Sequence, residues 1–286
     1  MRREGMIRFE GFVDIGGCRL HATVRGHGPT VVMERGADCG GVFGPLLDEV
    51  AEIASVVFYD RAGAGRSDPT ATDYTVAGIT ANLRALLRRL PVQTPAILAG
   101  WSLTGLSVLY HACKHPEDVA GLVLIDSTPY DFFDDTSLAG RLDFLRFGIR
   151  QLLFGRGDFK RFLRNGAGPA IDESLLGPYA RSIEKVRRNE IKPDNFRRSC
   201  ALTRDAVEAG LLPDVPILVL DAAVNTTVSA RLARRKHANY RRIVELAPRG
   251  RHVLVENGSH MMSLDRPDAI VDAVREVVAA TSLESG

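Results

Sequence analysis

The stretch AGWSLTG (residues 99–105) follows a short apolar run, PAILA (residues 95–99), and precedes LSVLYHACKHP (residues 106–116), whose apolar residues recur at helical spacing. A strand, a turn and a helix are therefore predicted in close succession. Small residues around Ser102 favour a tight turn that pushes the serine hydroxyl outward and lets the helix pack close to the strand. A serine at this junction is either the cap of the helix or a nucleophile, and the rest of the chain is needed to choose between them.

The composition of the 286 residues is that of an ordinary globular protein, with 45% hydrophobic and 25% charged residues. A net charge of +2 gives no basic face for nucleic acid or acidic lipid, so neither partner is expected. No apolar run approaches the length of a membrane span, and the first residues lack the apolar core of a secretory signal. The cysteines, Cys18, Cys39, Cys113 and Cys200, have no paired spacing and are expected to be reduced. We therefore expect a cytoplasmic protein, and the excess of arginine over lysine indicates a bacterial, GC-rich genome.

Short apolar runs alternate with helix-periodic segments along most of the chain, which is typical of a mostly parallel sheet covered by helices on both faces. After a hairpin near the N-terminus, the strand-like runs are TVVM (30–33), SVVFY (55–59), PAILA (95–99), GLVLI (121–125), PILVL (216–220) and RHVLV (251–255). Between Asp126 and Pro216 the pattern is helical, without a strand-like run. We therefore predict a core formed by residues 1–127 and 214–286, and a helical cap or lid formed by residues 128–213.

Five motifs in order carry a resemblance to a known family: TVVMERG (30–36), VVFYDRAGAGRSDP (56–69), AGWSLTG (99–105), GLVLID (121–126) and VENGSHMMSLDRPDAIVDAV (255–274). Together they resemble the α/β-hydrolase superfamily of serine hydrolases, and the YDRAG motif is similar to that of a bacterial subgroup. The resemblance implies an α/β-hydrolase fold: a mostly parallel eight-stranded sheet flanked by helices, with a helical lid inserted after the sixth strand.

The resemblance implies that Ser102 is the nucleophile rather than a helix cap. The family pattern G-x-S-x-G is matched by Gly100 and Ser102, whereas Thr104 replaces the second glycine. By position, the backbone N–H groups of Ala37 and Leu103 are expected to form the oxyanion hole.

Two further residues near this motif are candidates for contact with the substrate. Arg35 replaces the histidine that relatives usually carry before the oxyanion site, and its guanidinium could bind an anionic group of the substrate. The alternative is a plain structural pairing of Glu34 with Arg35 or Arg61. Trp101, directly before the nucleophile, is the second candidate.

His260 is predicted to be the general base. It alone among the seven histidines follows the end of a strand-like run, in the loop NGSH before the last helix, and it resembles the family's base in this position. The others are His21 and His27 in the N-terminal hairpin, His111 and His115 along a helix, His237 in a polar helical segment, and His252 at the start of the last strand, far from its carboxyl end.

The acid of the triad has two candidates, Asp126 and Asp221. The place where many relatives carry the acid corresponds to Asn225, which cannot carry a charge. Asp221 directly follows PILVL and Asp126 directly follows GLVLI. Some members, haloalkane dehalogenases among them, place the acid after this earlier strand. We favour Asp126 with Asp221 as the alternative, and a dyad or a pseudo-triad through Asn225 stays open.

The predicted reaction is acyl transfer to water, in which Ser102 forms an acyl-enzyme with a small, mostly apolar carboxylic ester, lactone or thioester. A carbon–carbon bond hydrolase, an acyltransferase, a cofactor-free haloperoxidase or a non-catalytic small-molecule binder remain alternatives. The sequence holds neither a metal-ligand motif nor a dinucleotide fingerprint, so no metal or cofactor is expected. The oligomeric state is left open.

Overall fold

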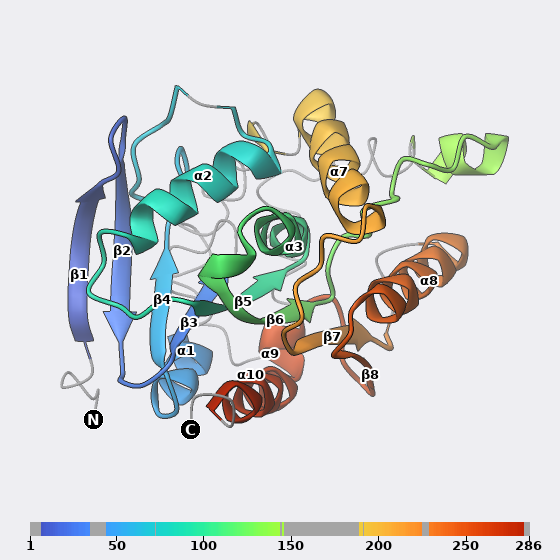
Figure 1. Ribbon diagram of the computed structural model, residues 1–286. Helices are drawn as coiled ribbons and strands as arrows, with labels where there is room; N and C mark the ends of the chain where they lie inside the picture. The colour runs from blue at the N-terminus through green and yellow to red at the C-terminus, as the bar shows by residue number, and fades with distance from the viewer. Residues whose placement is uncertain are drawn as a thin grey trace.

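The computed structural model describes residues 7–34, 44–71, 73–143, 145, 189–190, 192–224 and 229–282. Its centre is an eight-stranded sheet in the order β1-β2-β4-β3-β5-β6-β7-β8 (Figure 1). β2 pairs antiparallel with both β1 and β4, and all other neighbours are parallel. The predicted eight-stranded, mostly parallel sheet is therefore confirmed.

The strands are β1 (Ile7–Asp14), β2 (Arg19–Arg25), β3 (Thr30–Glu34), β4 (Ser55–Tyr59), β5 (Ala96–Trp101), β6 (Val119–Ile125), β7 (Ile217–Ala222) and β8 (Gly250–Val255). The helices are α1 (Gly44–Ala51), α2 (Val76–Leu87), α3 (Leu103–Lys114), α7 (Pro193–Glu208), α8 (Ala230–Leu246), α9 (Met262–Asp265) and α10 (Pro267–Ser282), with a 3-10 turn, η2, at Pro116–Asp118.

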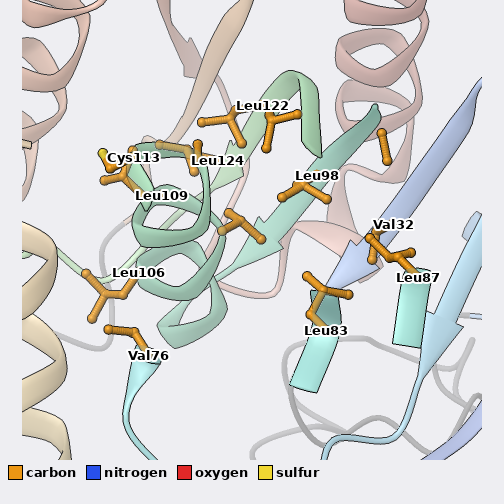
Figure 2. Close-up of a cluster of buried hydrophobic side chains, with 14 of the residues drawn as sticks. Val32, Val76, Leu83, Leu87, Leu98, Leu106, Leu109, Cys113, Leu122 and Leu124 are labelled. Atoms are coloured by element: carbon orange, nitrogen blue, oxygen red, sulfur yellow. The ribbon is translucent and has the colours of Figure 1, made fainter. Parts of the chain in front are cut away.

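Apolar side chains of the central strands point alternately to the two faces of the sheet, so both faces are apolar. In β5, Leu98 joins a buried cluster with residues of α2, α3, α7 and α8, whereas its neighbour Ile97 joins a second cluster with residues of α1 and α10. Successive side chains of a strand point to opposite faces, so both faces of a central strand must be apolar when helices cover both. Figure 2 shows Leu98 among Val32, Leu122 and Leu124 of the first cluster.

The parallel register brings the carboxyl ends of β5, β6 and β7 to one edge of the sheet. Trp101 pairs with Ile125, and Ile125 pairs with Leu220. Ser102, Asp126 and Asp221 therefore come next to one another in space, although Asp126 and Asp221 are far apart in the sequence.

The segment predicted as a lid is described only in part. Within residues 128–213, α7 is its longest described element and packs against α3 and α2, with Phe196 and Cys200 in the first apolar cluster. The backbone N–H of Val76, at the start of α2, donates to the hydroxyl of Ser199 at 3.1 Å. Most of the remaining segment, including residues 146–188, lies outside the described residues, so the lid and its boundaries stay a prediction. Among the helices that the structure describes, none combines the length and the apolar character that crossing a bilayer requires.

We expect Leu98→Ala to lower the free energy of unfolding by about 3 kcal/mol, because it opens a cavity between β5 and its helices. Leu98 is fully buried, whereas Leu254 in β8 is 55% exposed, so Leu254→Ala is the matched control and should change stability by less than ~1 kcal/mol. Urea unfolding followed by circular dichroism measures both. Equal losses in the two variants would contradict this account of the core.

Candidate active site

Ser102 lies in a strained turn between β5 and α3. Its backbone has φ 55° and ψ −124°, a region that residues with a side chain rarely adopt. Its N–H donates to the carbonyl of Ile125 at 3.1 Å, and its carbonyl accepts from the N–H of Thr128 at 2.9 Å. The end of β6 thus fixes the turn from both sides. Ser102 occupies the N-cap position of α3, but its side chain makes no capping hydrogen bond.

The residues around Ser102 explain how the turn tolerates a threonine in place of a glycine. A Cβ atom on Gly100 would lie 2.7 Å from Cγ2 of Val108, so only glycine lets α3 pass this close to β5. Thr104 is buried, and its Oγ1 lies 2.5 Å from the carbonyl oxygen of Glu34 and 2.8 Å from that of Trp101. Gly105 lets α3 approach the residues after β6 closely, because a Cβ on Gly105 would collide with Ser127.

His260 and Asp126 form a direct pair. His260 Nδ1 lies 2.7 Å from Oδ2 of Asp126. The other carboxylate oxygen, Oδ1, accepts from the N–H of Ala222 at 3.1 Å and from Nζ of Lys236 at 2.6 Å. Burial raises the pKa of the Asp126 carboxyl, but the hydrogen bonds and positive charges of His260 and Lys236 outweigh it and bring the pKa down to about 2. Asp126 is therefore an ionised carboxylate that can orient an imidazole.

Two contacts hold the loop that carries His260. Trp101 Nε1 donates to the carbonyl oxygen of His260 at 2.7 Å, and the two rings stack with centroids 5.1 Å apart. Met261 and Met262, directly after His260, are buried and anchor the loop to the core. Trp101, predicted as a substrate contact, therefore has a structural contact with the candidate base.

Asp221, the alternative acid, faces different histidines. It is fully buried at the end of β7, and its Oδ2 contacts Nδ1 of His237 and lies 3.0 Å from Nε2 of His252. Its Oδ1 lies 3.2 Å from Nζ of Lys236. The expectation that His252 lies far from the carboxyl end of the last strand is wrong, because β8 begins at Gly250 and is only six residues long.

Of the residues predicted to form the oxyanion hole or, as Arg35, to contact the substrate near it, the structure describes only Leu103. Leu103 is the first residue of α3, where a backbone N–H has no partner within the helix. Arg35, Ala37 and Asn225 lie outside the described residues, and their roles stay predictions.

A buried charge cluster beside the site includes a residue that the sequence analysis missed. Arg61 Nη1 lies 3.5 Å from Glu34 Oε2, one of the two pairings expected for Glu34, and Arg61 also donates to Glu190. The hydroxyl of Tyr59 donates to the carboxylate of Glu34. Burial raises the pKa of Glu190 to about 7, because the shared guanidinium of Arg61 lowers it too little. No local motif marks Glu190, which is 129 residues from Arg61 in the sequence.

Within the described ranges, a group close enough to hold a metal ion lies at the far end of α3 and not beside Ser102. It consists of His115, Glu117 and Asp118. Arg84 donates to both carboxylates, and its Nε lies 2.6 Å from Asp118. The guanidinium already supplies the positive charge there, so the group is an ion-pair cluster.

Glu190 predicts a specific dependence of stability on pH. Its folded pKa of about 7 lies above the ordinary value of 4.5, so the folded protein takes up a proton between these pH values and the unfolded chain does not. The contribution of Glu190 to stability should therefore rise as pH falls from 7 toward 4.5. Urea midpoints of wild type and Glu190→Gln across this range measure the difference, with the exposed Glu245→Gln as control. A wild-type profile parallel to that of Glu190→Gln would contradict the assignment.

Comparisons with known proteins agree with this architecture. The sequence model described as "Alpha/beta hydrolase family" matches residues 26–273. The chain is 29% identical over 276 residues to a pimeloyl-[acyl-carrier protein] methyl ester esterase of Xanthomonas axonopodis pv. citri, covering 91% of this chain and 99% of the relative. A shorter match, 33% identical over 119 residues and covering 41% of this chain and 42% of the relative, is to 2-(acetamidomethylene)succinate hydrolase of Mesorhizobium japonicum.

Among solved structures, Cfl2 of Burkholderia cenocepacia has the same fold, with a TM-score of 0.73 at 20% identity over 96% of this chain and 97% of that chain. The family match confirms the resemblance to α/β hydrolases, and the matched residues include β3 to β8 together with Ser102, Asp126 and His260. The similarity of the YDRAG motif to that of a bacterial subgroup stays a prediction. The chain belongs to the alpha/beta hydrolase family.

Proposed function

We propose that this protein is a serine hydrolase of small, mostly apolar carboxylic esters, with Ser102 as nucleophile, His260 as general base and Asp126 as the acid. The main support for this proposal is the contact between His260 and Asp126. The imidazole of His260 lies 2.7 Å from a buried, ionised carboxylate at the strand end next to the strained Ser102 turn. A carboxylate on Nδ1 fixes the tautomer in which Nε2 can accept a proton, as acyl transfer through serine requires.

The reaction proceeds in two halves. Nε2 of His260 takes the hydroxyl proton of Ser102 while Oγ attacks the ester carbonyl, and the backbone N–H of Leu103, with that of Ala37, stabilises the oxyanion. The tetrahedral intermediate collapses, the C–O bond to the alcohol breaks, and His260 returns the proton to the leaving alkoxide. Water then attacks the acyl-enzyme with His260 again as base, which releases the carboxylic acid and restores Ser102.

Asp126 is preferred over Asp221 because of which imidazole each carboxylate faces. Asp126 bonds His260, which follows the last strand, whereas Asp221 is occupied by His237, His252 and Lys236. An acid at the end of β6 lies at the same edge of the sheet as an acid at the end of β7, so Asp126 can serve in place of a residue after β7. Asp221 then has the role of a buried counter-ion.

The relatives support ester chemistry and suggest where to look for the substrate. The relative from Xanthomonas axonopodis is named for cleaving a methyl ester of an acyl group. We therefore infer that methyl esters of medium-length acyl chains, alongside simple activated esters, are substrates of this protein.

Replacing the proposed triad residues should abolish ester hydrolysis selectively. We expect kcat/KM for p-nitrophenyl esters to fall about 10⁴-fold or more in Ser102→Ala, and about 10²- to 10⁴-fold in Asp126→Asn, which leaves His260 without its carboxylate. Asp221→Asn is the matched control and should stay within about tenfold of wild type. Strong loss in Asp221→Asn with activity kept in Asp126→Asn would move the acid to β7.

A fluorophosphonate probe distinguishes an enzyme from a non-catalytic binder of the same fold. The probe phosphonylates an activated serine, so mass spectrometry should find the adduct on Ser102 of the wild type and none in Ser102→Ala. Denatured wild type should also remain unlabelled. A native protein that neither labels nor cleaves any ester of the series would overturn the hydrolase proposal in favour of ligand binding.

Trp101→Phe tests whether Trp101 positions the base or binds the substrate. Phenylalanine keeps an aromatic ring beside His260 but loses the Nε1–H that donates to its carbonyl oxygen. A positioning role predicts a fall in kcat of about tenfold with little change in KM. A raised KM at unchanged kcat would instead identify Trp101 as a substrate contact.

A further inference from the structure

Lys236, in α8, places a buried ammonium group between the two candidate acids. Its Nζ lies 2.6 Å from Oδ1 of Asp126 and 3.2 Å from Oδ1 of Asp221. All three side chains are at most 8% exposed. Nζ also lies 5.7 Å from the centre of the Tyr240 ring. A cation is therefore buried directly behind the pair of Asp126 and His260.

Lysine at this position contrasts with the rest of the helix. The other basic side chains of α8, apart from His237, are Arg231, Arg234, Arg235, Arg241 and Arg242. Arg231 and Arg242 pair with acidic residues nearer the surface, Asp135 and Glu208. An ammonium group is compact and has three donors, so it can serve two carboxylates in a narrow space where a planar guanidinium needs more room.

Both carboxylates turn one oxygen toward this ammonium, but Lys236 donates a hydrogen bond to Asp126 and only forms an ion pair with Asp221. Each turns Oδ1 toward Lys236 and Oδ2 toward imidazole: Asp126 toward His260, and Asp221 toward His237 and His252. The N–H of Ala222 donates to the same Oδ1 of Asp126, which leaves Oδ2 for His260. Lys236 and Ala222 thus both contact the carboxylate oxygen of Asp126 that does not face His260.

We propose that Lys236 is a positioning residue that ties Asp126 to Asp221, turns Oδ2 of Asp126 toward His260 and, by partly neutralising Asp126, tunes the basicity of that histidine. The inference rests on the proposed function for its catalytic meaning. The effect of Lys236 on the protonation of His260 can, however, be measured without a substrate.

The charges around Lys236 determine in which direction the titration midpoint of His260 should move in each variant. An ionised Asp126 stabilises the imidazolium form of His260, and the ammonium of Lys236 opposes that stabilisation. Without the ammonium, in Lys236→Met, the titration midpoint of His260 should rise by about one pH unit. In Asp221→Asn the ammonium loses one of its carboxylates and acts more strongly on Asp126, so the midpoint should fall by about half a unit.

Three other titratable groups adjoin Lys236 and the two carboxylates: His237, His252 and Tyr240. His237 and His252 both face Asp221. Tyr240 faces the ammonium with its ring and adds no charge, because burial raises its pKa well above the ordinary value. The double variant Lys236→Met/Asp221→Asn removes one charge of each sign, and its His260 should titrate between the midpoints of wild type and Lys236→Met.

The experiment is an NMR titration of the histidine side chains in the full chain. The Cε1–H signal of His260 is assigned by its loss in His260→Gln and is then followed against pH in wild type and variants. Arg234→Met is the matched control, because it removes a positive charge from an exposed position of the same helix. It should leave the midpoint of His260 unchanged. In the pH profile of kcat/KM for ester hydrolysis, the midpoint on the acidic side should shift in the same direction as the His260 midpoint of each variant.

Opposite shifts in Lys236→Met and Asp221→Asn support the inference, whereas unmoved midpoints, or shifts of the same sign, overturn it. If Lys236→Met does not fold, Asp221→Asn and the double variant decide: a midpoint in Asp221→Asn equal to that of wild type overturns the inference. A wild type inactive toward esters would overturn the proposed function. The titration would still test the coupling of Lys236 to His260.

Discussion

The site depends on one constraint, the backbone pairing between the ends of β5 and β6. The N–H of Ser102 bonds the carbonyl of Ile125, and the carbonyl of Ser102 accepts from Thr128. This pairing holds Ser102 at φ 55° and the neighbouring Asp126 at φ 41°, two unfavourable backbone conformations side by side. The strain is tolerated because both residues are fixed between buried strands. The side chains of Ser102 and Asp126 therefore lie at the same edge of the sheet.

Behind this edge the protein buries more charge than a triad needs. Asp126, Asp221 and Lys236 are all buried, and they are paired with one another or with imidazoles. Burying a charge without a partner is costly, so each member depends on the others. The cluster of Glu34, Arg61 and Glu190 repeats this arrangement on the side of β3 and β4, with two carboxylates on one guanidinium.

The departures of this chain from the family pattern are compensated by neighbouring residues. Thr104 replaces a glycine but satisfies its hydroxyl with the carbonyl oxygens of Glu34 or Trp101, while Gly105 provides the close approach to Ser127. The carboxylate next to His260 follows β6, and the one near the end of β7 contacts other histidines. Two buried carboxylates thus lie at the same sheet edge, and they face different histidines.

Local sequence determined the strands, most helices and the place of Ser102 and His260, because apolar periodicity and turn residues act over a few neighbours. Local signals do not separate Asp126 from Asp221, since both follow strand-like runs, and the preference for Asp126 rests on the precedent of other family members. Only the tertiary structure distinguished them, because the distance from a carboxylate to His260 depends on strand register and on loops that are distant in sequence. Lys236 and Glu190 likewise carry no local motif. Their environment exists only when α8 and the segment before α7 pack against the sheet, since burial and pairing are properties of the assembled fold.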